Sequence, residues 1–397
     1  MTPSRRADVA FWIAILAGVL FIAFLGPLGR RLEMVHSNDF SGFWSGPRSV
    51  LVGVSPWDPQ RYAPTAVAID TKTPDALVDD YMPHVVLALL PLGLLPLDVA
   101  AWVWMVASMA CSATALRALL RTFLPGRTVS HAALGLALFV GQPGFHTLVL
   151  GQWALLLMSA LTVVVLALRA GHVRRAGLAA LAFLAKPQLF VWTAVGLALP
   201  AIRDVRYRRF VTYALVLAGA LVLFAWLAYP DWFPAWLADI PARRTGRSAV
   251  LFSALGQVLG MPGRILAIAV VAGGVYLASR FVMASDAWLA AWLSLSSAGA
   301  IYSWSYDQVL LFVPLVIASG VLVANGRELA ARNLALAGAL TLLIVSPIFY
   351  AIGVARHDET FSIAVPVAFC GAILWALWPY RAGALIRERT AQQVQAA

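Results

Sequence analysis

Long runs of apolar residues recur along almost the whole chain, and they constrain its fold more than any other feature. Many of these runs reach the ~20 residues that an α-helix needs to cross the hydrocarbon core of a bilayer. Of the 397 residues, 61% are hydrophobic and only 12% are charged, a balance that a soluble domain of this size does not adopt. The runs are continuous, whereas the strands of a membrane β-barrel alternate. The sequence therefore predicts an all-α polytopic membrane protein.

Arginines gathered in short clusters between the apolar runs account for most of the formal charge of +11. Such clusters are typical of cytoplasmic loops, so they indicate membrane topology and not nucleic-acid binding. Arg5 and Arg6 place the N-terminus in the cytoplasm, and Arg381 and Arg389 place the C-terminus there. The pattern predicts a multi-pass protein of the cell membrane in which residues 1–397 form one transmembrane domain of about ten spanning helices. Eight of these spans have sequence-defined limits near residues 11–28, 99–119, 211–229, 264–282, 287–303, 308–324, 333–352 and 362–378.

Several segments depart from simple spans. Residues 30–83 form a first outer loop rich in aspartates, and residues 230–262 form a second outer loop. The run from Val85 to Leu95 is too short to span and is interrupted by prolines, which indicates an interfacial helix. Both outer loops and this helix are expected on one side of the membrane.

Residues 177–202 are apolar, but basic residues flank them on both sides. A single span would put one basic cluster outside, which the positive-inside rule disfavours. In the middle, Lys186 precedes Pro187, and the residue before a proline resists the helical conformation. The segment is therefore predicted to be a re-entrant helix pair whose apex carries Lys186 and Gln188 at membrane depth, where broken backbone lines a protein cavity.

Three charged residues are candidates for chemistry. Asp39 lies just after the first span, in HSNDFSGFW, where an N-cap role is the competing interpretation. A cation at membrane depth is costly and usually functional, which favours Lys186 as a ligand of phosphate over a snorkelling or structurally paired lysine. Asp307 lies in YSWSYDQ before another apolar run, so it either caps a helix or forms a carboxylate pair with Asp39. Cys111 and Cys370 both lie in apolar runs and the histidines are scattered, so we expect no disulfide, metal site or cofactor.

Five motifs occur in a fixed order between Asp39 and Pro314. They are NDFSGFWSGPRSVLVGVSPWDPQRY, YMPHVVLALLPLGLLP, LGQWALLL, LAKPQLF and YSWSYDQVLLFVPL. This ordered set resembles glycosyltransferase family 87, the polyprenol-phosphate-sugar-dependent membrane transferases. The family often has paired prolines after the tyrosine of the second motif, where this chain has Tyr81-Met82-Pro83. Some members have a histidine near the last motif, where this chain has Tyr306 and Asp307, so mannose is not favoured over arabinofuranose or another sugar.

The resemblance implies a helical bundle like that of the C-type glycosyltransferases, with its site at the outer face and Asp39 as the catalytic base. It implies a hexosyl- or pentosyltransferase whose partners are a polyprenyl-phosphate-linked sugar donor, a lipid or glycan acceptor and membrane lipids. With a single base and no second nucleophile, we expect inversion at the anomeric carbon. Lys186, Arg243 and Arg244 are expected to bind the donor phosphate. The expected contacts to the sugar or acceptor come from Trp44, Gln152, Gln188, Tyr306 and Asp307.

The main alternative is a membrane transporter or flippase of a lipid-linked or anionic substrate. Broken helices with a buried lysine also fit translocation. No inverted repeat is visible in the sequence, and the first outer loop is long, which favours the transferase.

Overall fold

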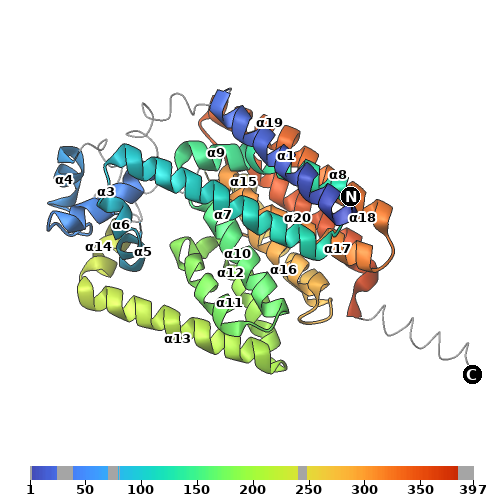
Figure 1. The fold of residues 1–397 in the computed structure, drawn as a ribbon. Helices are drawn as coiled ribbons and strands as arrows, with labels where there is room; N and C mark the ends of the chain where they lie inside the picture. Colours follow the sequence, from blue (N-terminus) through green and yellow to red (C-terminus); the bar gives the residue numbers. More distant parts are fainter. Residues whose placement is uncertain (1, 25–38, 70–78, 80, 240–247, 383–397) are drawn as a thin grey trace, which may run out of the picture.

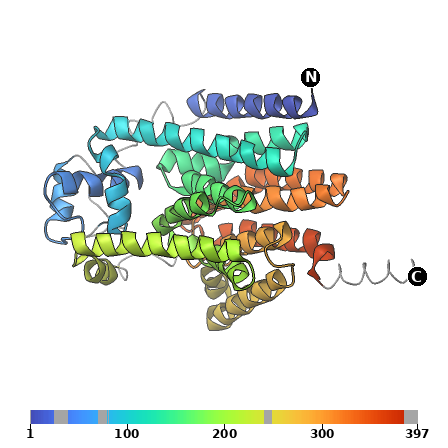
Figure 2. The same cartoon turned by 60° about the horizontal axis from the view of Figure 1, so that its bottom comes forward.

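The structure is a computed structural model of the whole chain and describes residues 2–24, 39–69, 79, 81–239 and 248–382. Apart from an isolated bridge between Phe281 and Arg381, this described part is built from helices, turns and bends and contains no β-strand. Its helices are long, apolar and packed against one another (Figures 1 and 2). The predicted class, an all-α polytopic membrane protein, is confirmed.

Eight helical stretches within the described residues are long and apolar enough to cross a membrane. They are Pro3–Ala23, Leu97–Phe123, Thr128–Leu150, Val205–Ala228, Leu251–Ser279, Ser305–Ala324, Glu328–Arg356 and Thr360–Tyr380. The expectation of about ten included two helices that are shorter, α10 (Ala154–Arg169, 16 residues) and α16 (Asp286–Ala298, 13 residues). The apolar run of α16 continues past its end, but the helix stops before Gly299 and irregular backbone follows. Hydropathy alone does not detect such an end.

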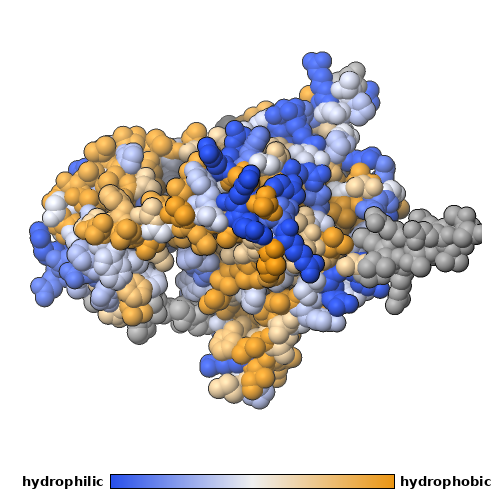
Figure 3. All heavy atoms as spheres, turned by 90° about the horizontal axis from the view of Figure 1, so that it is seen from below, coloured by the Kyte–Doolittle hydropathy of each residue, from blue (hydrophilic) through white to orange (hydrophobic). Residues whose placement is uncertain are grey.

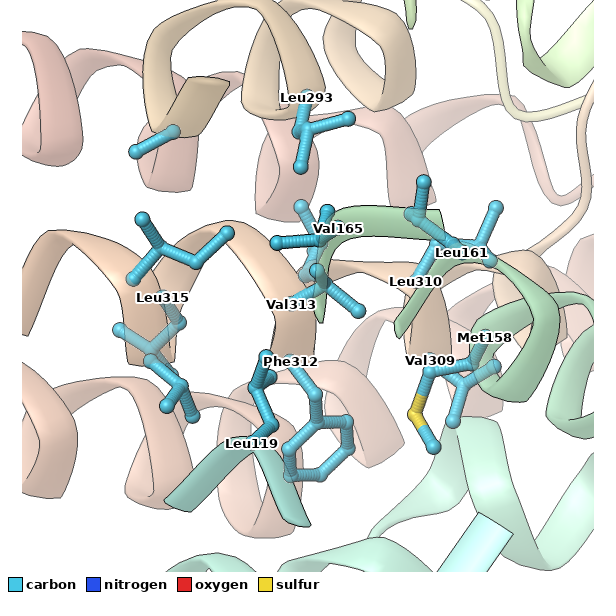
Figure 4. Close-up of a cluster of buried hydrophobic side chains, with 14 of the residues drawn as sticks. Leu119, Met158, Leu161, Val165, Leu293, Val309, Leu310, Phe312, Val313 and Leu315 are labelled. Carbon is cyan, nitrogen blue, oxygen red and sulfur yellow. The ribbon is translucent and has the colours of Figure 1, made fainter. Parts of the chain in front are cut away.

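The centre of the bundle is formed by α10, α16 and the stretch that joins η7 (Ser305–Leu311) to α17 (Phe312–Ala324). α7 (Leu97–Phe123) and α20 (Ala364–Leu377) pack around it. Figure 4 shows part of this core, where aliphatic and aromatic side chains from several helices interdigitate. The labelled side chains are Leu119, Met158, Leu161, Val165, Leu293, Val309, Leu310, Phe312, Val313 and Leu315.

The remaining long stretches surround this core. α1 (Pro3–Phe24) packs along α8 (Thr128–Val140), and α9 (Gln142–Leu150) follows α8 after a break at Gly141. The stretch from residue 328 to 356 comprises α18 (Glu328–Leu340), the π-helical turn η8 (Thr341–Val345) and α19 (Ser346–Arg356). A short turn η9 (Thr360–Ile363) then leads into α20, which ends in η10 (Trp378–Tyr380).

Short helices gather at one end of the bundle, at the left of Figure 1. They are α3 (Asp39–Leu51), α4 (Tyr62–Ala68), α5 (Pro83–Ala88), α6 (Leu90–Gly93) and α14 (Trp232–Asp239). The expected interfacial helix over Val85–Leu95 is thus divided into α5 and α6. α1 begins and α20 ends at the opposite end (Figures 1 and 2). The two described ends of the chain therefore share one side of the bundle, whereas their placement in the cytoplasm remains a prediction.

The segment around Lys186 is broken into short helices. α11 (Val173–Ala180) continues into the 3-10 turn η2 (Leu181–Ala185), and η3 (Pro187–Leu189) leads into α12 (Val191–Ala198) and η4 (Leu199–Ile202). At the break, Lys186 has φ −142° and ψ 68°, well outside the helical region. α11 packs against α10 and α13, whereas α12 packs against α16. Whether the two halves re-enter the same side of a bilayer stays a prediction.

Two long helices expose most of their apolar residues. α13 (Val205–Ala228) lies at the bottom of Figure 1, and α15 (Leu251–Ser279) is kinked where Gly260 adopts φ 63° before Pro262. Seen from below, the molecule presents wide hydrophobic areas beside gathered hydrophilic side chains (Figure 3). The exposed apolar residues of α13 include Leu215, Val216, Leu223, Phe224 and Leu227. Surfaces of this kind fit contact with lipid tails better than contact with water.

Candidate functional site

Asp39 is the first residue of α3 and is exposed to solvent. On the same helix, Phe40, Phe43 and Trp44 are buried against the start of α7. The Trp44 indole N–H donates to the Leu95 carbonyl at 3.0 Å, which fixes α3 to the segment after α6. This packing holds the helix that carries the Asp39 carboxylate.

A second carboxylate, that of Asp79, packs against α3. Asp79 is 3% exposed, accepts from the Tyr81 backbone N–H at 2.7 Å and lies against Gly46 of α3. A Cβ atom on Gly46 would meet Asp79 Oδ2 at 2.1 Å, so only glycine allows this approach. The aspartate-rich loop predicted from sequence thus contributes a structural residue as well as Asp39.

Gln152 contacts Asp39 directly. Its side-chain Nε2 donates to Asp39 Oδ2 at 2.5 Å, and the glutamine itself is 5% exposed. The turn that presents it is set by Gly151, which ends α9 at φ 73°, in the left-handed region that glycine tolerates. The Gly151 carbonyl accepts from the Trp104 indole at 2.6 Å. A buried amide on a fixed turn therefore orients an exposed carboxylate.

Lys186 is buried, with 6% of its surface exposed, and forms an ion pair with Asp307. The distance from Lys186 Nζ to Asp307 Oδ1 is 3.1 Å. The ammonium also lies over the ring of Tyr306, 4.6 Å from its centroid, a distance at which cation–π attraction contributes. The structure thus brings together three of the residues singled out from sequence.

Asp307 takes one of the two roles that the sequence left open, capping a helix, and it also pairs with Lys186, the structurally paired alternative weighed for that lysine. Its Oδ2 accepts from the Trp304 backbone N–H at 3.0 Å, which caps η7, while its Oδ1 faces Lys186. A carboxylate has several acceptor positions, so capping and ion pairing do not compete. A hollow on one side of Asp307 is lined by Ser303, Trp304, Gln308 and Leu189, among others.

A buried polar network behind η7 was not predicted from sequence. Gln142 Nε2 donates to Ser305 Oγ at 2.9 Å, and Ser346 Oγ donates to Gln142 Oε1 at 2.8 Å. Ser346 also lies 2.9 Å from Gln308 Oε1. The network links α9, η7 and α19 beside the π-helical turn, a feature that often accompanies functional sites. The hydropathy pattern does not mark Gln142 or Ser346, because each is a single polar residue in an apolar run.

His146 extends this network toward Tyr306. Its two ring nitrogens lie 3.2 Å from Gln142 Nε2 and 3.2 Å from the Tyr350 hydroxyl. The imidazole also makes an edge contact with the Tyr306 ring, with centroids 5.7 Å apart. The aromatic ring under Lys186 is therefore held from a second side.

Glu359 is a site residue that sequence reasoning missed. Its Oε2 accepts from the Ser305 backbone N–H at 3.0 Å, directly before Tyr306. Burial raises its pKa above the ordinary value of 4.5; hydrogen bonds from Ser305 oppose this, and the negative charges of Asp307 and Asp39 raise it further. The charges of Asp307 and Asp39 thus favour the neutral form of Glu359, and of these two Asp307 is the residue paired with Lys186. The only sequence signal was a glutamate in a short loop before an apolar run.

The other predicted contact residues lie as follows. Trp44 is 5% exposed and its N–H is already donated to a carbonyl, so its place is that of a packing residue. Gln188 is half-buried on η3, two residues after Lys186. Arg243 and Arg244 lie outside the described residues. Within the part of the chain that the structure describes, no group of three or more His, Cys, Asp or Glu side chains is arranged to hold a metal ion.

This arrangement suits group transfer. An exposed carboxylate can accept a proton, and a buried ammonium can stabilise an anionic leaving group. Such sites occur on many folds, so the fold itself does not define the reaction.

Comparison with known proteins identifies the family. The sequence profile of glycosyltransferase family 87 matches residues 81–347, about two thirds of the chain. This range includes Gln152, Lys186, Tyr306 and Asp307, whereas Asp39 and Glu359 lie outside it. No curated protein and no solved structure matches the chain. Because the match covers most of the chain, the protein belongs to glycosyltransferase family 87 and is a membrane glycosyltransferase.

Proposed function

We propose that the protein transfers a sugar from a polyprenyl-phosphate donor to a hydroxyl group of a lipid or glycan acceptor at the outer face of the cell membrane. One structural relationship carries the proposal: Gln152, which donates to the exposed Asp39 carboxylate, directly follows α9, and α9 packs against η7, whose Asp307 pairs with Lys186. This packing supports a shared site for the proposed base and the cation. Membership of a transferase family argues against the transporter alternative.

Asp39 is the proposed base. As the acceptor oxygen attacks the anomeric carbon, its O–H bond breaks and the proton passes to the Asp39 carboxylate. The bond between the anomeric carbon and the phosphate oxygen breaks, and its electron pair leaves with polyprenyl phosphate. A single displacement of this kind inverts the anomeric carbon. General base catalysis contributes roughly 10²- to 10⁴-fold to such a step.

Lys186 is the proposed partner of the departing phosphate. An ammonium has three N–H donors, so pairing with Asp307 leaves it able to bind further oxygens. Its burial strengthens its interaction with charge that develops on the leaving group. Asp307 and Tyr306 then hold the cation in place between turnovers. Because Lys186 is buried in the helical bundle, its position suits a phosphate that is attached to a lipid chain.

Charge and the fold both support the proposed outer location. The α3–α6 group that carries Asp39 lies at the end of the bundle opposite to the start of α1 and the end of α20. The arginine clusters favour a cytoplasmic position for the latter end. Nucleotide sugars are cytoplasmic, so an outer site needs a donor carried across the membrane on a lipid.

A transfer assay with the purified full-length protein tests this function. We would supply a panel of radiolabelled polyprenyl-phosphate hexoses and pentoses with acceptors extracted from native cell envelopes. Transfer is expected with one donor and is expected to fall at least 10²-fold in Asp39→Asn. Asp58→Asn is the matched control, because Asp58 lies in the same loop region and only bonds the nearby Gln60 and Arg61 amides. Undiminished transfer by Asp39→Asn in a folded protein would exclude Asp39 as the base.

A further inference from the structure

The turn that carries Glu359 is fixed from several sides. α19 ends at Arg356, and His357 reverses the chain at φ 52°, an uncommon conformation for a residue other than glycine. The Asp358 backbone N–H then donates to the Gly353 carbonyl at 2.9 Å. These local contacts bring the next residue, Glu359, back toward the bundle.

A second set of contacts locks the turn onto its neighbours. Asp358 Oδ1 accepts from the Thr360 backbone N–H at 2.8 Å, and Gln257 of α15 donates to Asp358 Oδ2 at 3.0 Å. A Cβ atom on Gly353 would lie 3.3 Å from the Cα atom of Glu359, so the turn lies tightly against α19.

The constrained turn positions Glu359 to accept one specific hydrogen bond. Glu359 Oε2 accepts the Ser305 N–H at 3.0 Å, and Ser305 is the first residue of η7. From the other side, Gln142 donates to the Ser305 hydroxyl. Tyr306 and Asp307, which hold Lys186, follow directly. Glu359 therefore anchors the start of the segment on which the Lys186 pair depends.

The charges of the site also act on Glu359. The groups that act on it are Asp307 from η7 and Asp39 from α3, and the Glu359 charge in turn acts on Tyr350 of α19. Because burial and these charges favour its neutral form, Glu359 takes up a proton at a higher pH than an ordinary glutamate.

We propose that Glu359 is a positioning residue of the transferase site: it holds the Ser305 amide, so that Tyr306 and Asp307 stay against Lys186. This inference rests on the proposed function. Glu359 acts through Ser305 and does not need to touch the substrate.

Two substitutions of Glu359 separate its hydrogen bond to the Ser305 amide from its negative charge. In Glu359→Ala the Ser305 N–H loses its acceptor, so kcat is expected to fall about ten- to a hundredfold. In Glu359→Gln the amide oxygen accepts the same bond, so kcat is expected to stay within about threefold. Glu328→Gln, an exposed glutamate paired with Arg127 on another loop, is the matched control.

Hydrogen–deuterium exchange provides a readout that does not depend on activity. Peptides covering residues 303–311 of the full-length protein are expected to lose protection at the Ser305 amide in Glu359→Ala and to keep it in Glu359→Gln. Equal protection of the Ser305 amide in the wild type, Glu359→Ala and Glu359→Gln would overturn the positioning role. A kcat as low in Glu359→Gln as in Glu359→Ala would overturn it too. If Asp39→Asn were still active, the base assignment would fail while exchange at Ser305 would still decide the role of Glu359.

Discussion

Lys186 and Asp307, 121 residues apart in the chain, form an ion pair with 8% and 5% of their side chains exposed. Burying two charges is expensive, and the attraction between them often only offsets that cost. A pair kept under these conditions is more readily explained by function than by stability. The predictions below start from this pair and move outward to the helices that hold it.

Replacing the pair separates its structural role from its chemical one. Lys186→Met leaves the Asp307 carboxylate buried without its cation and is expected to lower the free energy of unfolding by ~3–5 kcal/mol. Adding Asp307→Asn removes the unpaired charge while the side-chain oxygen still caps Trp304, so the double variant should recover most of the thermal stability. Transfer by the double variant is expected to stay ~10²-fold or more below the wild type, because the departing phosphate lacks a cation. Recovery of activity together with stability would assign Lys186 a structural role only.

Gln152 is expected to matter through Asp39. Gln152→Ala removes a hydrogen bond to a carboxylate, which is worth ~1.5–3 kcal/mol. The Asp39 side chain then loses the amide that orients it. We expect kcat to fall about tenfold or more with a smaller change in KM, measured in the donor-panel assay. Gln60→Ala, at an exposed position between α3 and α4, should leave both constants unchanged. A Gln152→Ala enzyme with wild-type kcat would contradict the orienting role.

The sequence predicted the features that depend on composition and on local backbone rules. The apolar runs gave the class of fold, and Lys186 before Pro187 gave the break in residues 181–189. Ordered motifs gave the family. In each case the physical cause, such as burial in lipid or the conformational limits of proline, acts within a short stretch of the sequence.

Other features depend on contacts between distant residues, which no window contains. Asp307 meets Lys186, Ser305 meets Glu359 and Gln142 meets Ser346 only after the helices pack. Trp44 was a candidate to stack on a sugar, but its side chain is covered once α3 packs against α7. Likewise, hydropathy did not distinguish the short α16 from a full span, because the apolar run outlasts the helix.

The pH dependence of stability is expected to report on His84 of α5. Burial lowers the pKa of His84 from its ordinary value of 6.5, and a backbone contact with Leu184 partly opposes this. Because the unfolded state binds the proton more readily, stability is intact above pH ~6.5 and falls as the pH drops toward the folded pKa, by at most ~1.4 kcal/mol per pH unit. Thermal unfolding in lipid nanodiscs at pH 7.5 and pH 5.5 measures the difference. His84→Gln should reduce this difference, whereas His172→Gln, at an exposed histidine, should not; an equal effect of both would contradict the assignment.

Two glycines on α3 offer a matched test of how Asp39 is held. A Cβ atom on Gly46 would meet Asp79 Oδ2 at 2.1 Å, whereas a Cβ atom on Gly42 would meet nothing within 4 Å. Gly42→Ala should therefore stabilise the protein by up to ~1 kcal/mol through helix propensity. Gly46→Ala should destabilise it by ~1–3 kcal/mol, because Asp79 or α3 must move. Since α3 carries Asp39, transfer should fall in Gly46→Ala and remain in Gly42→Ala, as judged from thermal unfolding and the transfer assay on the same samples. If both alanines behaved alike, the close packing of α3 on Asp79 would not be what positions the carboxylate.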